Sequence, residues 1–301
     1  MTRVATIPLQ RTLSEAIQRS QGALAATQKQ LATGKKAPDL ASLGTEAVRT
    51  LSARALVAKQ TAHADVAKRL GTTLALYDAH ISSIDTAGSD LLQSLKTAAG
   101  TNEGAGLQES ITAAFNTFRS ALNATEAGVP MFSGSQSAAP FTPEKLGDLV
   151  GLDPAGAFTN DNVRASARVG TNQDVQFGVT ASELGTGMVS ALRTLAEAGP
   201  IGAQPTPAQM DAIKTAIGQV GSALDTVRGI NANNGRKQTQ MDTLATRAEQ
   251  RNLLLQDLIG QNEDADLGQV AIDLAQQKTT LQASYSVFGQ LSGLSLVNYL
   301  R

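Results

Sequence analysis

The first candidates for chemistry are two histidines, His63 and His80, which are the only imidazole groups in the chain. Both lie in one long stretch of helical periodicity, nearly five turns apart, which corresponds to about 25 Å along a helix. A metal ion cannot be shared over that distance, and the chain has no Cys to complete a site. We therefore interpret both residues as ordinary surface histidines.

A second candidate is an acidic cluster near the C-terminus, formed by Glu263, Asp264 and Asp266, with Asn262 before it. Carboxylates at this density can bind calcium, but the regular spacing of a calcium loop and its closing bidentate Glu are missing. The same side chains suit the start of a helix, where carboxylates accept hydrogen bonds from free backbone N–H groups. We predict that Asp264 or Asp266 caps the last helix.

The lysine pair Lys35 and Lys36 is the nearest approach to a phosphate-binding motif. It follows Gly34, but the upstream glycine of a phosphate loop is missing, and a helix rather than a strand precedes it. Lysines at this place complement the negative end of a helix, which is the simpler interpretation. No dinucleotide-binding or nucleophile-elbow motif occurs. The sequence predicts no catalytic residue, no cofactor and no metal, and we expect that the protein is not an enzyme.

The composition narrows the class of protein and its partners. The 301 residues carry a net charge of -1 with both signs interspersed, so neither nucleic acid nor a membrane is expected as a partner. Hydrophobic residues make up 42% and aromatic residues only 3%, which favours long, thin helix packing over a bulky core. The N-terminus has no continuous apolar signal region, and no later run approaches a membrane span.

The helices that would position any site are clearest at the two ends of the chain. From Asp264 to Leu300 the apolar residues follow steps of three and four, which is the a/d pattern of a heptad helix, with only Gln277 and Ser284 polar in the series. A second heptad series follows the N-terminus and stops at Gly34 and Pro38. The predicted assembly interface consists of the apolar members of both series: Leu13, Ile17, Leu24, Leu31, Leu267, Val270, Leu274, Leu281, Phe288 and Leu291.

Between these ends, the chain predicts long helices around one irregular insertion. A helix of roughly 60 residues starts near Asp39 or Ser42, which would make it on the order of 90 Å long. Its first half is expected to pack through one face with Leu51, Ala55, Ala58, Ala62, Val66 and Leu70. A returning helix follows from Leu107 to Leu122. Alternating residues over 163–179 predict a β-hairpin, and Met188, Leu192 and Leu195 predict a short helix after it.

The predicted fold class is mainly α: an elongated rod of long antiparallel, coiled-coil helices formed by both termini, with a small α+β insertion in the middle. We expect the two terminal heptad series to face each other. The organisation has five parts: an N-terminal assembly helix over 1–38, a helical rod over 39–130, the α+β insertion over 131–207, the second half of the rod over 208–263, and a C-terminal assembly helix over 264–301.

Several of these passages resemble one protein family. The stretch Leu31–Lys36 (LATGKK), followed by Pro38 and Asp39, is similar to a turn that is typical of the bacterial flagellins, with Ala32 as a departure. The passage Met131–Gly134, with Pro140 and Phe141 after it, resembles the hook-associated protein 3 branch of that family.

The C-terminal region agrees with this resemblance. Glu263–Leu267 is similar to the entry of that family's last helix, and Leu281–Tyr285 to a phrase inside it. Leu294–Leu300 resembles the closing phrase of the hook-associated branch. Where ordinary flagellins tend to have an A-N-Q phrase, this chain has Gly289–Gly293, which favours the hook-associated branch. The similarity covers about two-thirds of the chain.

The resemblance implies a structural subunit of the flagellum that joins hook to filament, secreted by type III export to the extracellular flagellum and active in motility. The implied partners are further copies of the chain in a ring or helical array, another hook-associated protein, flagellin and an export chaperone. Two alternatives stay open at this point. One is a flagellin that builds the filament itself, and the other is a secreted or surface adhesin that binds a glycan through the insertion.

Overall fold

The computed structural model describes residues 3–297, and it describes the side chains of Pro8 and of residues 11–290. The chain forms two compact units. The terminal unit combines Met1–Gln60 with Gln250–Arg301, and the central unit comprises Thr61–Glu249.

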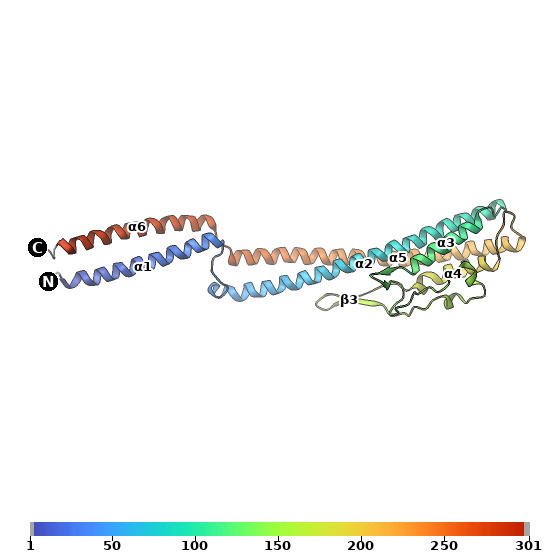
Figure 1. Cartoon of the computed structure of the whole chain (residues 1–301), viewed down its shortest axis with the longest axis horizontal. Helices are drawn as coiled ribbons and strands as arrows, with labels where there is room; N and C mark the ends of the chain where they lie inside the picture. Colours follow the sequence, from blue (N-terminus) through green and yellow to red (C-terminus); the bar gives the residue numbers. More distant parts are fainter. Residues whose placement is uncertain (1–2, 298–301) are drawn as a thin grey trace. The chain divides into compact units, whose positions relative to one another are not determined.

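The described residues form six α-helices and four short strands, so the prediction of a mainly α fold with a small α+β insertion is confirmed (Figure 1). The helices are α1 (Arg3–Thr33), α2 (Glu46–Thr101), α3 (Leu107–Leu122), α4 (Ala181–Glu197), α5 (Pro207–Glu263) and α6 (Leu267–Val297). The strands are β1 (Thr125–Glu126), β2 (Val129–Pro130), β3 (Ala165–Gly170) and β4 (Gln173–Phe177).

Helix α2 has 56 residues and starts a few residues later than predicted. The Asp39 carboxylate accepts a hydrogen bond from Ser42 N at 2.8 Å, and a short 3₁₀ turn follows over Ala41–Leu43. Gly44 then has a φ of 60°, a conformation that interrupts a right-handed helix. The long helix therefore begins at Glu46. Helix α5 has 57 residues and continues without a break through its polar interval at 231–235.

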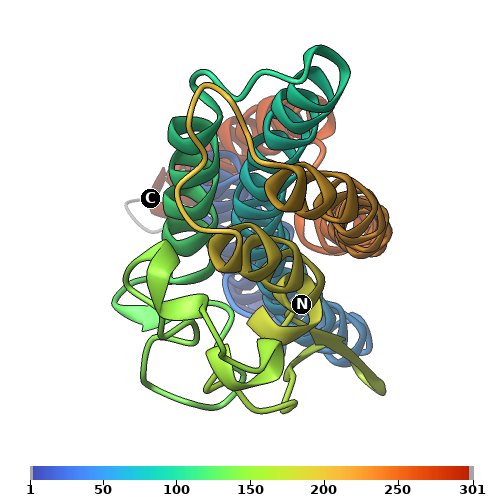
Figure 2. The same ribbon diagram turned by 90° about the vertical axis from the view of Figure 1, so that its right-hand side faces the viewer.

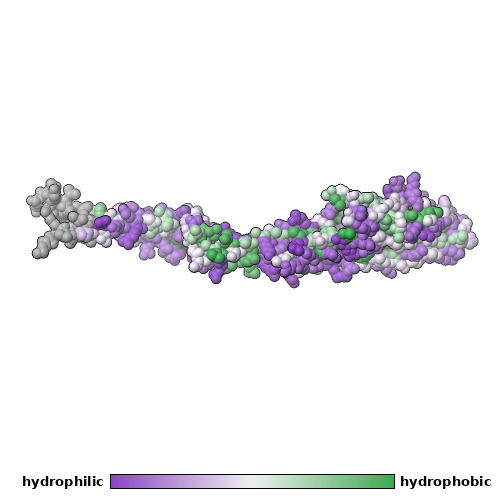
Figure 3. All heavy atoms as spheres, turned by 90° about the horizontal axis from the view of Figure 1, so that it is seen from below, coloured by the Kyte–Doolittle hydropathy of each residue, from purple (hydrophilic) through white to green (hydrophobic). Residues whose placement is uncertain are grey.

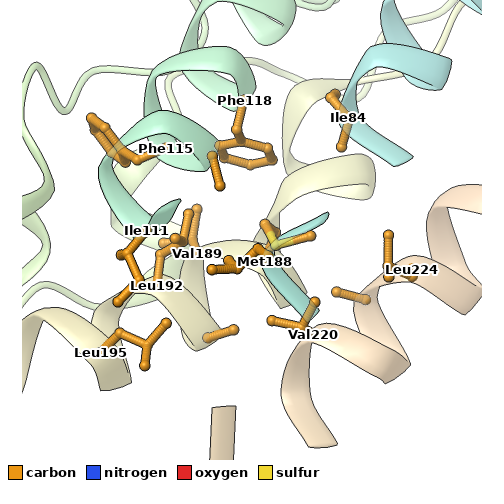
Figure 4. Close-up of a cluster of buried hydrophobic side chains, with 14 of the residues drawn as sticks. Ile84, Ile111, Phe115, Phe118, Met188, Val189, Leu192, Leu195, Val220 and Leu224 are labelled. Carbon is orange, nitrogen blue, oxygen red and sulfur yellow. The ribbon is translucent and has the colours of Figure 1, made fainter. Parts of the chain in front are cut away.

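The core of the central unit lies where α2, α3, α4 and α5 meet (Figure 2). Phe118 of α3 points toward Met188 of α4, and Val220 and Leu224 lie on the α5 side of the cluster (Figure 4). Phe118 is 2% exposed and lies edge-to-face against Phe141 at 5.4 Å between ring centroids. Large rings from the 16-residue helix α3 thus fill the space beside the long helices α2 and α5.

The predicted β-hairpin over 163–179 is confirmed. Strands β3 and β4 pair antiparallel, with Ala165 opposite Phe177 and Ala167 opposite Val175. Val169 and Val175 are buried, and they pack on a cluster formed by residues of α2 and α5: Ala67, Leu70, Leu74, Met241 and Ala245. The alternating pattern therefore has its physical reason in one covered face of the hairpin.

Candidate assembly site

Helices α1 and α6 of the terminal unit pair along most of their length (Figure 1), so the two heptad series face each other as predicted. Ile17, Val270 and Leu281 are buried in this seam. Leu13, Leu24, Leu274 and Phe288 are half-buried. Leu31 is 40% exposed and Leu267 is 49% exposed, so the seam loosens at the inner ends of the two helices. The side chain of Leu291 lies outside the described residues.

The polar members of the seam do not link the two helices. Thr27 donates a hydrogen bond to the carbonyl of Ala23 at 3.0 Å, and Ser284 donates to the carbonyl of Thr280 at 2.8 Å, so each hydroxyl is satisfied within its own helix. Among the described residues, Gln277 Oε1 is buried without a hydrogen-bond partner. A buried carbonyl without a donor destabilises a packed seam. The pairing is therefore weaker than an all-apolar heptad seam of the same length.

An ionic junction lies at the inner end of this helix pair, within the terminal unit. Arg54 Nη2 donates to both carboxylate oxygens of Glu263, at 2.6 and 2.8 Å. Lys35 Nζ lies 2.6 Å from Asp264 Oδ1 and 3.5 Å from Glu263 Oε2. The side chain of Glu263 is only 8% exposed, so this carboxylate is held by two cations in a largely desolvated place.

Backbone hydrogen bonds run through the same junction. Lys36 N donates to the carbonyl of Glu263 at 2.7 Å, and Ala265 N donates to the carbonyl of Gly34 at 2.8 Å. Gly34 has a φ of 68°, which suits the glycine that ends α1. The turn after α1 and the turn before α6 are thus fastened to each other by main chain and side chain together.

The structure changes part of what the sequence predicted for Asp264, Asp266 and Lys35. Asp266 Oδ1 accepts from Gly268 N at 2.9 Å and from Gln269 N at 3.2 Å, so the predicted cap of the last helix is confirmed for Asp266. Asp264 instead pairs with Lys35, and the contact raises the pKa of the Lys35 ammonium. Lys35 follows the end of α1, as predicted, but the sequence did not indicate that a turn 228 residues later in the chain supplies carboxylates to its ammonium.

At its start, up to Ala58, α2 packs through a different face from the one predicted, whereas Leu70 of the predicted face is buried and Val66 packs beside it. Thr50 and Ala53 are buried, whereas Leu51 is 62% exposed and Ala55 and Ala58 are exposed as well. Together with Val48, which is 73% exposed, these form an outer stripe of α2, defined as Val48, Leu51, Ala55 and Ala58. Its steps of three, four and three are those of a heptad seam, and a second series with the same steps, from Thr50 through Ala53 and Val57 to Gln60, faces inward.

Exposed apolar side chains are concentrated in the terminal unit. Fourteen large hydrophobic residues are exposed among those described, and ten of them belong to this unit: Leu31, Val48, Leu51, Leu56, Leu253, Leu254, Leu267, Ile272, Tyr285 and Val287. Figure 3 shows green, apolar surface gathered where α2 begins. Clustered apolar exposure on this scale is typical of a surface that another protein covers.

The histidines do not form a site. Both are half-buried rather than fully on the surface, and the ring of His80 lies edge-on to Phe132 at 6.3 Å between centroids. The described part of the chain contains no group of His, Asp and Glu side chains that could hold a metal ion. Within residues 3–297, no helix is long and apolar enough to cross a membrane.

Comparison with known proteins finds the fold among solved structures. A flagellar hook-associated protein of Vibrio parahaemolyticus superposes with a TM-score of 0.61, over 74% of this chain and 100% of the other. FlgL of Bacillus cereus superposes with a TM-score of 0.56, over 70% of this chain and 98% of the other. The chain has their fold. Both are 15% identical to it in sequence. No family model matches the chain, and no curated protein matches it by sequence.

Proposed function

We propose that the chain is a non-enzymatic structural subunit of the bacterial flagellum that joins hook to filament. The observation that carries the proposal is the concentration of uncovered apolar residues in the terminal unit, on a fold shared with a flagellar hook-associated protein over that protein's full length. A fold alone does not fix a function, but a terminal unit that leaves its apolar residues in water requires a partner.

The geometry supports different roles for two sets of helix faces, the seam of α1 and α6 and the outer stripe of α2. The seam of α1 and α6 is closed within one chain, so its residues act by ordering the two terminal helices. The outer stripe of α2 has a heptad spacing and is uncovered, so it offers a place for a helix of another subunit. Repeated heterologous contacts of this kind generate a ring or a helical array. Assembly would thus bury the outer stripe rather than open the seam.

Export follows from the same proposal. A subunit of the hook–filament joint has to leave the cell, and the proposed route is type III export followed by ordering of the terminal helices on assembly. The weak seam, with Gln277 and Ser284 in place of apolar residues, favours helices that stay soluble before assembly. The proposed partners are further copies of the chain, a second hook-associated protein, flagellin and an export chaperone.

Imaging of the labelled protein on flagellated cells tests this function. Label confined to the base of the filament is the expected result. Label along the whole filament would identify a filament subunit instead. Cells that lack the protein should shed their filaments or fail to build them, and normal filaments on those cells would contradict the structural role.

A point variant tests the proposed interface without removing an element. Leu51→Glu places a charge in the outer stripe, and we expect a folded chain that no longer supports filament attachment. Val163→Glu is the matched control, because Val163 is 57% exposed and belongs to the central unit. Equal loss of attachment in both variants would sink the assignment of the outer stripe.

The adhesin alternative has its own test. The insertion over 131–207 is the part that would bind a glycan, so the full chain should be retained on a glycan surface if this alternative holds. Retention that survives Leu51→Glu, combined with normal filaments in cells lacking the protein, would favour the adhesin over the joint.

A further inference from the structure

A polar cleft of about 500 Å³ lies in the central unit, between the insertion and α5. Its lining includes Arg164 before β3, Glu183 of α4 and four polar residues of α5: Thr226, Asn233, Asn234 and Lys237. A volume of this size holds a ligand as large as a monosaccharide. No step of flagellar assembly proposed above uses this cleft.

The one carboxylate of the cleft is already engaged. Glu183 Oε1 accepts a hydrogen bond from Arg164 Nη2 at 2.5 Å, and its Oε2 accepts from Thr180 N at 3.2 Å. The second contact is part of the capping box at the N-terminus of α4, where a carboxylate is favoured. Glu183 is therefore held by its own helix and cannot turn to Lys237 without opening that cap.

Lys237 is left without a counter-ion. Within the described part of the chain, its ammonium forms neither an ion pair nor a hydrogen bond, and the side chain is half-buried. Partial burial lowers the pKa of Lys237, and the nearby Arg164 guanidinium lowers it further, against a smaller opposing effect of Glu183. By contrast, Lys35 and Lys68 each face a carboxylate within 2.6 Å. An unpaired, partly desolvated ammonium in a cleft is placed to receive an anion.

The charge of the lining indicates which anion. Arg164 and Lys237 contribute two positive charges and Glu183 one negative charge, which leaves one positive charge to be neutralised. A carboxylate carries one negative charge and balances the lining, whereas a phosphate monoester carries nearly two at neutral pH and would leave an excess negative charge beside Glu183. Thr226 donates its own hydroxyl proton to the carbonyl of Ser222, so its oxygen remains free to accept a hydrogen bond from a ligand hydroxyl.

We propose that this cleft binds a carboxylate, with Lys237 as its counter-ion and Thr226 accepting a neighbouring hydroxyl. The carboxylate has two possible sources: a free hydroxy acid, such as an acidic monosaccharide, or an Asp or Glu side chain of a second copy of the chain. The proposal is independent of the flagellar role, because it rests on the central unit alone.

The experiment is a calorimetric titration of the full chain with D-glucuronate at neutral pH and low salt, with D-glucose as the uncharged probe of the same size. Glucuronate should bind saturably and glucose at least tenfold more weakly. Lys237→Met, which keeps the length of the side chain and removes its charge, should weaken glucuronate binding at least tenfold. Lys214→Met is the matched control on α5, since Lys214 is 63% exposed, and it should bind like the unmodified chain.

A sedimentation measurement on the same proteins distinguishes the sources. If glucuronate and Lys237→Met both reduce self-association, a second copy supplies the carboxylate, and if neither changes it, the ligand is a free acid. Equal binding of glucose and glucuronate, or unchanged binding by a folded Lys237→Met protein, overturns the proposal. Absence of binding, together with self-association that is unaffected by the variant, overturns it as well. Filament attachment should persist in Lys237→Met if the ligand is a free acid. Failure of the carboxylate proposal and failure of the proposed flagellar role therefore give different results.

Discussion

The two units of the chain bury their apolar residues in opposite proportions. Of the 46 hydrophobic residues that are buried among those described, 42 belong to the central unit and only four to the terminal unit: Ile17, Ala53, Val270 and Leu281. The exposed large hydrophobic residues show the reverse, with ten in the terminal unit and four in the central unit. The central unit therefore derives its stability from its own core, and the terminal unit leaves much of its apolar surface for contacts outside the chain.

The kinds of side chain explain this difference. The central unit fills its interior with rings and branched residues, including Phe115, Phe132 and Ile81, each at most 1% exposed. The terminal unit buries few large side chains: Ile17, Val270 and Leu281 in the seam, while the start of α2 packs through the small Ala53 and the polar Thr50. Two helices joined through such residues bury less area per turn than a layered core. We therefore expect the two units to respond differently to the same kind of substitution.

The largest loss of stability is expected from a cavity in the core of the central unit. Phe118→Ala removes a ring that is 2% exposed, and such truncations cost about 3–5 kcal/mol. The free energy of unfolding, measured by urea denaturation followed by circular dichroism, should fall by that amount. Val163→Ala is the control, since Val163 is 57% exposed, and should change the value by less than about 0.5 kcal/mol. A small effect of Phe118→Ala would contradict the assignment of the main core to this unit.

The next effect concerns two ion pairs that both join α2 to α5. Glu263→Gln removes the carboxylate that Arg54 and Lys35 share, and the loss of a charge-assisted, largely buried contact is expected to cost about 1–3 kcal/mol. Hydrogen exchange should report the change as faster exchange at the ends of α1 and α6, with the central unit unchanged.

The control for that variant is Glu249→Gln. Glu249 pairs with Lys68 at 2.5 Å, but the two side chains are 51% and 59% exposed, so screening by water leaves little to lose. Equal losses of stability in Glu263→Gln and Glu249→Gln would contradict the expected difference between the buried and the exposed ion pair.

The contact with Asp264 raises the pKa of Lys35 above 10.5, so the stabilisation that Lys35 contributes is present below pH 10.5 and is lost as the pH rises further.

The sequence predicted the helices of this fold well because their signals are local. Heptad spacing predicted α1 and α6 and their pairing, and the alternation around Val169 and Val175 predicted the hairpin. The start of α2 was missed, because the cap formed by Asp39 and the φ of Gly44 depend on a short turn that periodicity does not report.

The candidate site was predicted less completely, since its contacts are distant in sequence. The seam residues were identified, but Lys35 and Asp264 were treated as separate helix ends, because no local pattern brings residues 229 positions apart together. The packed face at the start of α2, up to Ala58, was misassigned for another reason. Its first half carries two heptad series one or two positions apart, and periodicity alone does not say which one the chain covers.

In the seam of α1 and α6, we expect a substitution that increases stability, by less than the losses predicted above. Gln277→Leu replaces a buried carbonyl that has no partner among the described residues, and it should stabilise the pairing of α1 and α6 by about 1 kcal/mol. Slower hydrogen exchange in both helices is the measurement. Gln276→Leu is the control, because Gln276 is exposed on the same turn and should leave exchange unchanged. Faster exchange in Gln277→Leu would mean that the amide is needed where it lies.

The smallest effect should come from an exposed ion pair of the central unit, the fork of Arg168 to Asp174 across the hairpin at 2.8 and 3.0 Å. Arg168 lowers the pKa of Asp174 through this hydrogen bond, so any stabilisation is present above pH 3.8 and is lost as the pH falls below it. Both side chains are more than half exposed, and water screens the pair. Asp174→Asn should therefore leave the melting temperature at pH 7 within experimental error, and hairpin chemical shifts should change only locally. A clear fall at pH 7 would show that the hairpin depends on its surface charges, and not on Val169 and Val175 packed against α2 and α5.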